Sequence, residues 1–271
     1  MNYRMLSQGL AGACLVLGTL GAGSAQADAT TDEIARYREM IADGNPSELF
    51  ALQGEELWKQ KRGPRNASLE QCDLGLGPGV VKGASARLPR YFKDTGRVQD
   101  LETRLMTCME TLQGIDPKTI INAAWGKGER EKMQAIVAYV VTESHGEKID
   151  IDMKPPQMKK MYELGKMTFY YRGGPMDFSC ATCHGDKDKR IRLQDLPDLR
   201  TQAGAAAGWG SWPAYRVSNG QFWTMQHRLN DCFRQQRFPE PIYGSDVTIA
   251  LSVYMAATGN GGTVMTPGIK R

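Results

Sequence analysis

Apolar residues recur at helical spacing along much of the chain. The clearest stripe passes through Phe222, Met225, Leu229, Cys232 and Phe233, at positions i, i+3, i+7, i+10 and i+11. This spacing predicts an amphipathic helix that buries these side chains. Similar patterns predict helices over 47–60, 97–112, 130–143, 156–171, 217–236 and 244–257, with a further helix expected over 31–42. Strand signals are weak and short, and loops rich in Gly and Pro are expected over 173–179 and 203–213, so the fold class is predicted to be mainly α.

The first 27 residues have the pattern of an export leader. Arg4 is the only charged residue before Asp28, an apolar stretch follows, and Ala25-Gln26-Ala27 is an A-x-A cleavage pattern. The apolar stretch is shorter than the roughly 20 residues that cross a bilayer, and no later segment is apolar enough to span one. We therefore expect a signal peptide over 1–27, cleavage after about Ala27, and a periplasmic protein without a membrane span.

The mature chain has room for two small domains and a balanced charge. Removing the leader leaves 271 − 27 = 244 residues, which suits two domains of roughly 100–120 residues each. The formal net charge of +4 becomes +3 without Arg4, and this is too mild to indicate a nucleic-acid partner. Five cysteines remain in a compartment where disulfides persist, namely Cys72, Cys108, Cys180, Cys183 and Cys232.

A C-x-x-C-H motif provides the strongest chemical signal. In Cys180-Ala181-Thr182-Cys183-His184, the two thiols suit thioether bonds to haem c and the histidine suits the proximal iron position. A zinc site would need a second Cys/His pair at matching spacing, and a thioredoxin-like redox pair would need a βαβ context. Neither is found in the sequence, so one covalently bound haem c is predicted.

The motif leaves the sixth iron ligand open. Electron-carrying cytochromes of this kind use Met or His in that position, although a methionine is more often a packing residue. The candidates are Met225, His227, Cys232, Met255, Met265 and, upstream, His145, which is expected at a surface turn.

An internal repeat indicates two related domains. Residues 88–109 align without a gap with residues 212–233, at an offset of 124. The identical pairs are Pro89/Pro213, Tyr91/Tyr215, Gly96/Gly220, Arg104/Arg228, Leu105/Leu229 and Cys108/Cys232. The repeat predicts two cytochrome c-like domains, over 28–150 and 151–271.

The first domain lacks a haem motif. Cys72 stands where the motif should be, but neither a second cysteine nor a histidine follows it. Cys72 and Cys108 can then form a disulfide, which would close a loop of about 37 residues; two buried free thiols are the alternative. The first domain is therefore predicted to have lost its haem, and Cys232 is left single.

Because the other four cysteines are assigned to the haem and to the disulfide, Cys232 is the favoured sixth iron ligand. It lies on the buried stripe of its helix, and a thiolate ligand would give the haem a low reduction potential. Arg228 stands one turn earlier, near the same face. Its guanidinium could neutralise a haem propionate or bind an anionic substrate, and the spacing does not separate these two roles.

Taken together, these features resemble SoxA, the larger subunit of the SoxAX cytochrome complex of bacterial sulfur oxidation. The resemblance covers nearly all of the mature chain and is most specific over residues 54–79, 88–108, 169–185 and 212–241. The absent motif at Cys72 matches the one-haem members, in which a disulfide occupies the lost haem site.

The resemblance implies an activity and partners. It implies an L-cysteine S-thiosulfotransferase that works with a small cytochrome, SoxX, in a heterodimer. The complex would couple thiosulfate oxidatively to a cysteine of the SoxYZ carrier and pass two electrons through haem to a c-type cytochrome. Cys232 matches an iron ligand found as a catalytic cysteine persulfide, and Arg228 matches a residue that contacts the sulfur anion. A thiosulfate dehydrogenase and a plain electron-transfer cytochrome c are the alternatives.

Overall fold

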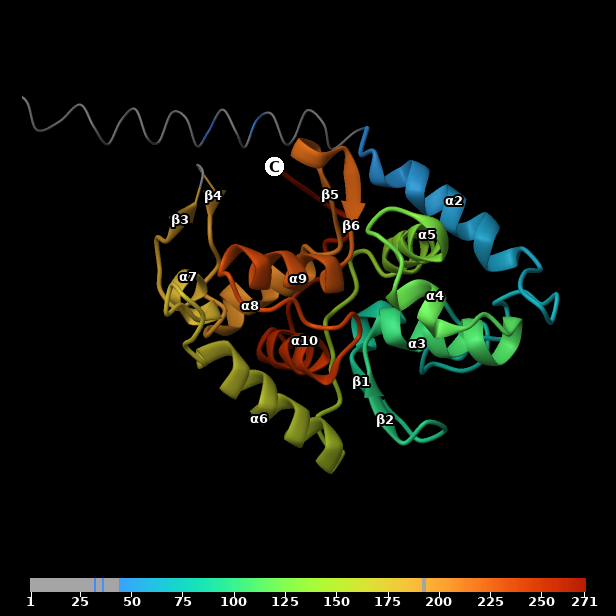
Figure 1. Ribbon diagram of the computed structural model, residues 1–271, viewed down its shortest axis with the longest axis horizontal. Coiled ribbons are helices and arrows are strands. Elements are labelled where there is room, and N and C mark those ends of the chain that lie inside the picture. Colours follow the sequence, from blue (N-terminus) through green and yellow to red (C-terminus); the bar gives the residue numbers. More distant parts are fainter. Residues whose placement is uncertain (1–31, 33–35, 37–43, 192–193) are drawn as a thin grey trace, which may run out of the picture. The chain divides into compact units, whose positions relative to one another are not determined.

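Helices account for most of the regular structure of the chain (Figure 1). The computed structural model describes residues 32, 36, 44–191 and 194–271, and residues 44–271 form one compact unit. The α-helices are α2 (Ser47–Lys59), α3 (Leu101–Cys108), α4 (Pro117–Ile121), α5 (Gly128–Thr142), α6 (Pro156–Tyr170), α7 (Cys180–His184), α8 (Gln202–Gly210), α9 (Met225–Gln235) and α10 (Asp246–Thr258). The prediction of a mainly helical protein is confirmed, whereas the leader and the helix expected over 31–42 lie outside the described residues, apart from Asp32 and Arg36. Within the part described, no helix is both long and apolar enough to cross a membrane.

The strands are short and form three small sheets. Their bounds are β1 (Arg90–Phe92), β2 (Arg97–Gln99), β3 (Arg190–Ile191), β4 (Gln194–Asp195), β5 (Ala214–Arg216), β6 (Gln221–Trp223) and β7 (Gly268–Lys270). β1 pairs with β2 and β3 with β4, both antiparallel. β5 lies between antiparallel β6 and parallel β7, so the C-terminal strand joins a hairpin formed more than 40 residues earlier.

Two helix pairs cross at glycines in the same way. A Cβ atom added at Gly54 of α2 would lie 1.9 Å from the carbonyl oxygen of Ala135 in α5. At Gly165 of α6 the corresponding distance is 2.0 Å, to the carbonyl oxygen of Ala250 in α10. Only glycine permits this approach of two helix backbones. The two halves of the described chain therefore contain matching helix crossings.

Gly54→Ala and Gly165→Ala are each expected to destabilise the protein by about 1–3 kcal/mol or more, because the new methyl group meets backbone that must move away. Chemical denaturation of the holoprotein measures the change in the free energy of unfolding. Gly44→Ala is the matched control, since its Cβ would meet nothing within 4 Å. Equal, small losses in all three variants would contradict this interpretation of the crossings.

The aligned repeat forms a hairpin followed by a helix in both halves. Phe92 pairs with Arg97 in the first hairpin, and Arg216 pairs with Gln221 in the second, each 124 residues later. The predicted helices over 97–112 and 217–236 consequently begin too early. The side chains of Asp100 and Thr224 accept hydrogen bonds from backbone N–H groups of the first turns of α3 and α9, so these helices start there and leave the preceding residues to the hairpins.

The expected loop over 203–213 is wrong for most of its length, because α8 spans Gln202–Gly210. Its glycines are packing positions: a Cβ at Gly204 would lie 2.0 Å from the carbonyl oxygen of Asp198, and one at Gly210 would lie 2.4 Å from that of Thr263. The alanines between them favour the helix, and the Thr201 side chain caps it.

Buried polar groups link α9 to the first half. The backbone N–H of Gln226 donates to Glu102 Oε2 at 3.0 Å, and its side-chain amide donates to Asp100 Oδ2 at 2.6 Å. Tyr243 donates its hydroxyl to Glu102 Oε1 at 2.5 Å. Burial, followed by the charge of Asp100, raises the pKa of Glu102 to about 8. Since Gln226 stands at the start of α9, this network positions the helix that carries Arg228 and Cys232.

Glu102→Gln is expected to weaken the pH dependence of stability. A carboxyl whose folded pKa is near 8 stabilises the fold fully below its unfolded value of about 4.5, and this stabilisation is lost as the pH rises toward 8. The neutral amide removes that loss and keeps an acceptor oxygen. Thermal unfolding from pH 5 to 8 should therefore show a smaller fall in melting temperature for the variant than for the wild type. An equal fall in melting temperature from pH 5 to 8 in the variant and the wild type would contradict this expectation.

Candidate active site

The C-x-x-C-H motif forms a one-turn helix, α7, that holds His184 in a defined orientation. The Ser179 N–H donates to Thr182 Oγ1 at 3.0 Å and starts the turn. His184 Nδ1 lies 3.1 Å from the carbonyl oxygen of Pro197, and the His184 carbonyl accepts the N–H of Leu199 at 2.9 Å. With Nδ1 as the donor, the Nε2 lone pair is left for a metal, which is the tautomer that an axial histidine needs.

Two adjoining cavities open beside this histidine. Their volumes are about 240 Å³ and 380 Å³, and they share His184, Arg216 and Arg228 among their lining residues. The smaller one is also lined by Cys183 and Cys232. The larger one is lined by Cys180 and by mainly apolar side chains: Phe169, Leu199, Trp212, Met225, Leu229, Leu251 and Met255.

These residues fit a covalently bound haem. Cys180 and Cys183 are free thiols, the apolar walls suit a porphyrin, and the combined space is of the size of known cofactor sites. His184 and Cys232 line the same cavity and are the two candidate axial ligands. Haem bound there would supply a redox centre beside the Cys232 sulfur.

Electrostatic interactions also join these groups. Burial, followed by the charge of Cys232, raises the pKa of Cys180 to about 12. Burial and then Cys232 likewise raise the pKa of Cys183, whereas Arg228 lowers it. Burial, with a smaller contribution from Arg228, lowers the pKa of His184. The sequence placed Arg228 and Cys232 on one face of a helix, and the structure brings both to α7.

A buried carboxylate holds Arg228. Arg228 Nη1 donates to Asp231 Oδ2 at 3.1 Å, and the guanidinium lies 5.5 Å from the centroid of the Trp212 ring. Asp231 also accepts hydrogen bonds from Arg234 at 2.5 Å and from Gln235 at 2.6 Å. The charge of Asp231 is therefore shared among three donors, and Arg228 keeps a defined orientation toward the cavities.

The structure places the other candidate ligands in different surroundings. The His227 ring is stacked between Trp125 and Trp223, with centroid distances of 3.9 Å and 4.0 Å, and it lines neither cavity. His145 is exposed, and its Nδ1 lies 2.9 Å from the carbonyl oxygen of Thr266. Met265 is 54% exposed. Met225 and Met255, by contrast, are buried in the wall of the larger cavity.

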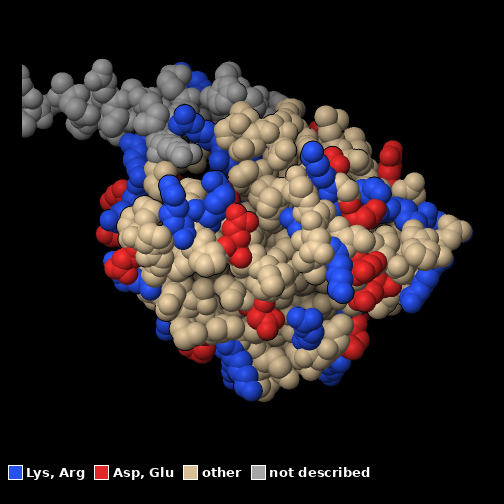
Figure 2. Space-filling model, in the orientation of Figure 1, with Lys and Arg blue, Asp and Glu red and all other residues tan. Residues whose placement is uncertain are grey.

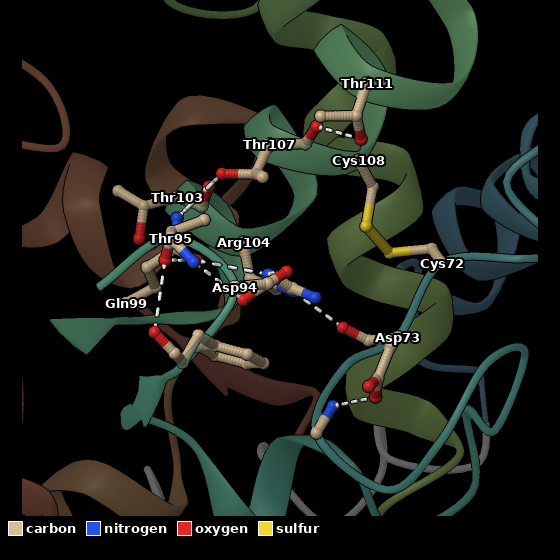
Figure 3. A network of polar contacts seen from close by, with 12 residues as sticks. Cys72, Asp73, Asp94, Thr95, Gln99, Thr103, Arg104, Thr107, Cys108 and Thr111 are labelled. Atoms are coloured by element: carbon tan, nitrogen blue, oxygen red, sulfur yellow. Dashed lines mark hydrogen bonds and ion pairs between the residues drawn. A yellow bond between two sulfur atoms is a disulfide. The ribbon is translucent and has the colours of Figure 1, made fainter. Parts of the chain in front are cut away.

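The first half contains a disulfide at the equivalent of Cys232. Cys72 and Cys108 form a disulfide (Figure 3). Both are almost fully buried in an apolar cluster that includes Leu69, Leu74 and Leu105. Side chains thus pack around this disulfide, whereas Cys232 lines the smaller cavity.

The sequence did not indicate several of the residues that line the two cavities. Arg216 lines both cavities, Ser218 and Arg271 line the smaller one, and Lys270 lines the larger one. Lys270 of β7 pairs with Arg216 of β5, and no local sequence pattern predicts this strand pairing. Figure 2 shows Lys and Arg side chains gathered at the upper left of this face, over the region of β4, α7 and α9 in Figure 1.

Comparisons with known proteins identify the family of this chain. The family model described as SoxA/TsdA, cytochrome c domain, matches residues 53–149. The chain is 70% identical to the L-cysteine S-thiosulfotransferase subunit SoxA of Hydrogenophilus thermoluteolus, over 90% of this chain and 91% of that protein. It is 36% identical to a SoxA subunit of Hydrogenobacter thermophilus, over 95% and 97% of the two chains.

A solved structure shows the same fold. The crystal structure of SoxXA from P. pantotrophus superposes with a TM-score of 0.69 at 25% identity, covering 84% of this chain and 79% of that chain. The identities of 70% and 36% to these SoxA subunits extend over at least 90% of each aligned chain, well beyond the C-x-x-C-H motif. The chain therefore belongs to the SoxA family of L-cysteine S-thiosulfotransferase subunits.

Proposed function

We propose that this chain couples thiosulfate to a protein cysteine at a single haem c, held by thioether bonds from Cys180 and Cys183, with His184 and Cys232 as the axial iron ligands. The observation that carries the proposal is that Cys183, His184, Arg228 and Cys232 line one cavity. An ordinary electron carrier would need only the haem and its ligands. An arginine and a free thiol in the same cavity support chemistry on an anion.

The reaction is an oxidation of two sulfur groups. A carrier thiol and thiosulfate, carrier–SH + S₂O₃²⁻, give carrier–S–S–SO₃⁻ + H⁺ + 2 e⁻. An S–S bond forms and the carrier S–H bond breaks, with the proton released to water. The haem, when bound, would supply a one-electron acceptor, so the two electrons would leave one at a time toward a c-type cytochrome.

The chain's own side chains supply binding and a reactive sulfur. The planar guanidinium of Arg228 suits the oxygens of a small dianion, and Asp231 holds it in orientation. Cys232 would provide a thiolate ligand to the haem iron, and we propose that it carries the reactive group as a persulfide, which is more acidic than a thiol. The apolar wall formed by residues such as Leu229 and Leu251 excludes water from the other side of the site.

We further propose that the chain consists of two cytochrome c-like domains, over residues 28–150 and 151–271, and that the first has no haem. The matching glycine crossings and hairpins support two equivalent halves. The Cys72–Cys108 disulfide and the apolar side chains around it occupy the part of the first half that corresponds to the haem side of Cys232.

The partners follow from the family. The similar SoxXA structure supports a heterodimer with a SoxX-type small cytochrome, and SoxYZ is the proposed carrier. We place the protein in the periplasm, with the leader removed after about Ala27.

Product analysis tests the function. The haem-loaded chain with its SoxX partner should attach thiosulfate to SoxYZ, with two electrons delivered to a cytochrome for each adduct. Tetrathionate formation that does not depend on SoxYZ would identify a thiosulfate dehydrogenase instead. Electron paramagnetic resonance should show a low-spin ferric thiolate/imidazole signal, whereas a His/Met signal would favour a plain electron carrier using Met225 or Met255.

A further inference from the structure

The first half contains a closed site, in which side chains pack around the disulfide, and the second half contains an open site, which is lined by a cavity. The two sites can be compared residue by residue. Because the two hairpins keep the same register at an offset of 124, Phe92 is equivalent to Arg216 and Asp94 to Ser218. Arg104 of α3 is likewise equivalent to Arg228 of α9. The arginine is the same in both halves, but residues near it differ, among them Phe92/Arg216, Asp94/Ser218 and Thr107/Asp231.

In the first half the arginine is fully engaged with its own protein (Figure 3). Arg104 Nη1 donates to Asp94 Oδ2 at 2.7 Å, and Nε donates to the carbonyl oxygen of Asp73 at 2.6 Å. Its guanidinium lies over the Phe92 ring, 4.0 Å from the centroid, and its side chain is 6% exposed. Asp94 therefore neutralises the arginine, and Phe92 covers it.

In the second half both of these residues are changed in the direction that favours an anion. The carboxylate position holds Ser218, which is neutral and can donate a hydrogen bond, and the ring position holds the cation Arg216. Arg216, Ser218 and Arg228 all line the cavity that contains Cys232. Relative to the first half, the hairpin side of the site has lost one negative charge and gained one positive charge, whereas α9 adds Asp231, at the position of Thr107, as the carboxylate that pairs with Arg228.

The C-terminal strand adds to the same positive surface. Arg216 pairs with Lys270 in the parallel β5–β7 register, and both line the larger cavity. Gly268 permits the close approach of β7, because a Cβ there would lie 2.4 Å from the carbonyl oxygen of Ser211. Among the described residues that line the two cavities, Asp195 is the single acidic side chain.

We propose that Arg216 is a second anion-binding residue of the site, beside Arg228, and that the neutral side chain at position 218 avoids a carboxylate on the hairpin side of the thiosulfate site. Two guanidiniums match the charge and the oxygens of this small dianion. The identity of the anion rests on the proposed function; the assignment of the residues rests on the comparison of the two halves.

Ser218→Asp tests the proposal by introducing the carboxylate of the first half. We expect the Kd for thiosulfate, measured by calorimetry on the ferric holoprotein with its small cytochrome partner but without carrier, to rise at least about tenfold. Ser218→Asn is the matched control, with nearly the same shape but no charge, and should stay within about twofold of the wild type. Equal affinities for the Asp and Asn variants would overturn the proposal.

Arg216→Phe introduces the phenylalanine found at the equivalent position of the first half. This variant tests the proposal if Ser218→Asp does not fold. Its Kd should also rise about tenfold, and Arg216→Lys should recover part of the affinity. A change in the haem reduction potential with an unchanged Kd would instead assign Arg216 to a haem propionate and overturn the proposal.

The binding assay also separates this inference from the proposed function. Wild-type protein that binds thiosulfate but does not couple it to the carrier would refute the function and leave the residue assignment intact. Wild-type protein that does not bind thiosulfate would overturn the residue assignment.

Discussion

Cys232→Ser and Cys232→Met are expected to lower the rate of thiosulfate coupling to the carrier by at least about 10³-fold. Cys232 is the free thiol of α9 that lines the cavity with His184 and Arg228. Serine keeps the size but is not a thiolate, and methionine can bind iron but cannot carry a persulfide. The coupling rate with SoxX, SoxYZ and a cytochrome acceptor measures the loss.

The two variants also separate ligation from catalysis. Cys232→Met can give a haem with His/Met ligands, visible by electron paramagnetic resonance, so a low rate in that variant would show that electron transfer alone is insufficient. Met265→Leu is the control, because this exposed methionine lies outside both cavities and should change neither rate nor signal. A Cys232→Met variant with more than a tenth of the wild-type rate would contradict a catalytic role.

Helical periodicity alone predicted two long helices closely, although neither has a side-chain N-cap. The helices expected over 130–143 and 156–171 correspond to α5 and α6 within two residues at each end. The errors occurred where packing decides the structure. Residues 97–99 and 221–223 form hairpins by pairing with β1 and β5. In α8, Gly210 is required by its contact with the distant backbone of Thr263.

The candidate site was predictable only in part, for a similar reason. Cys180, Cys183 and His184 stand in one motif, and Arg228 and Cys232 are one helical turn apart, so short-range spacing indicates them. Lys270 reaches the larger cavity through a strand pairing across 54 residues, from Arg216. Such pairing depends on tertiary structure, which the hydrophobic pattern does not contain.

The residues that differ between the two copies of the repeat are also informative. Its identical residues, such as Gly96/Gly220, serve the shared turn, where both glycines adopt left-handed φ values of 66° and 62°. The non-identical pairs Phe92/Arg216 and Asp94/Ser218 are the positions at which the closed and open sites diverge. The identical pairs include turn residues but also Arg104/Arg228 and Cys108/Cys232, so the substituted neighbours of this arginine and cysteine are what distinguish the two sites.

Removing the disulfide of the first half is expected to give the largest loss of stability. Cys72→Ala with Cys108→Ala should lower the free energy of unfolding by about 4 kcal/mol, because the bridge closes a sequence separation of 36 residues in the unfolded chain. Both cysteines are buried, so the lost sulfur atoms add a packing cost. Denaturant unfolding of the holoprotein, followed by far-ultraviolet circular dichroism, measures the change.

A reductant separates the cross-link from the packing. Wild-type protein unfolded and refolded with a phosphine reductant keeps both sulfur atoms but loses the bond, so it should recover less stability than the oxidised protein and more than the double alanine variant. The haem signal of the folded double variant should match the wild type, since the bridge lies in the apolar cluster with Leu69 and Leu105, outside the two cavities. A loss below about 1 kcal/mol would mean that the packed side chains alone hold the first half together, and a changed haem signal would mean that the bridge also positions α9 through the Glu102–Gln226 contact.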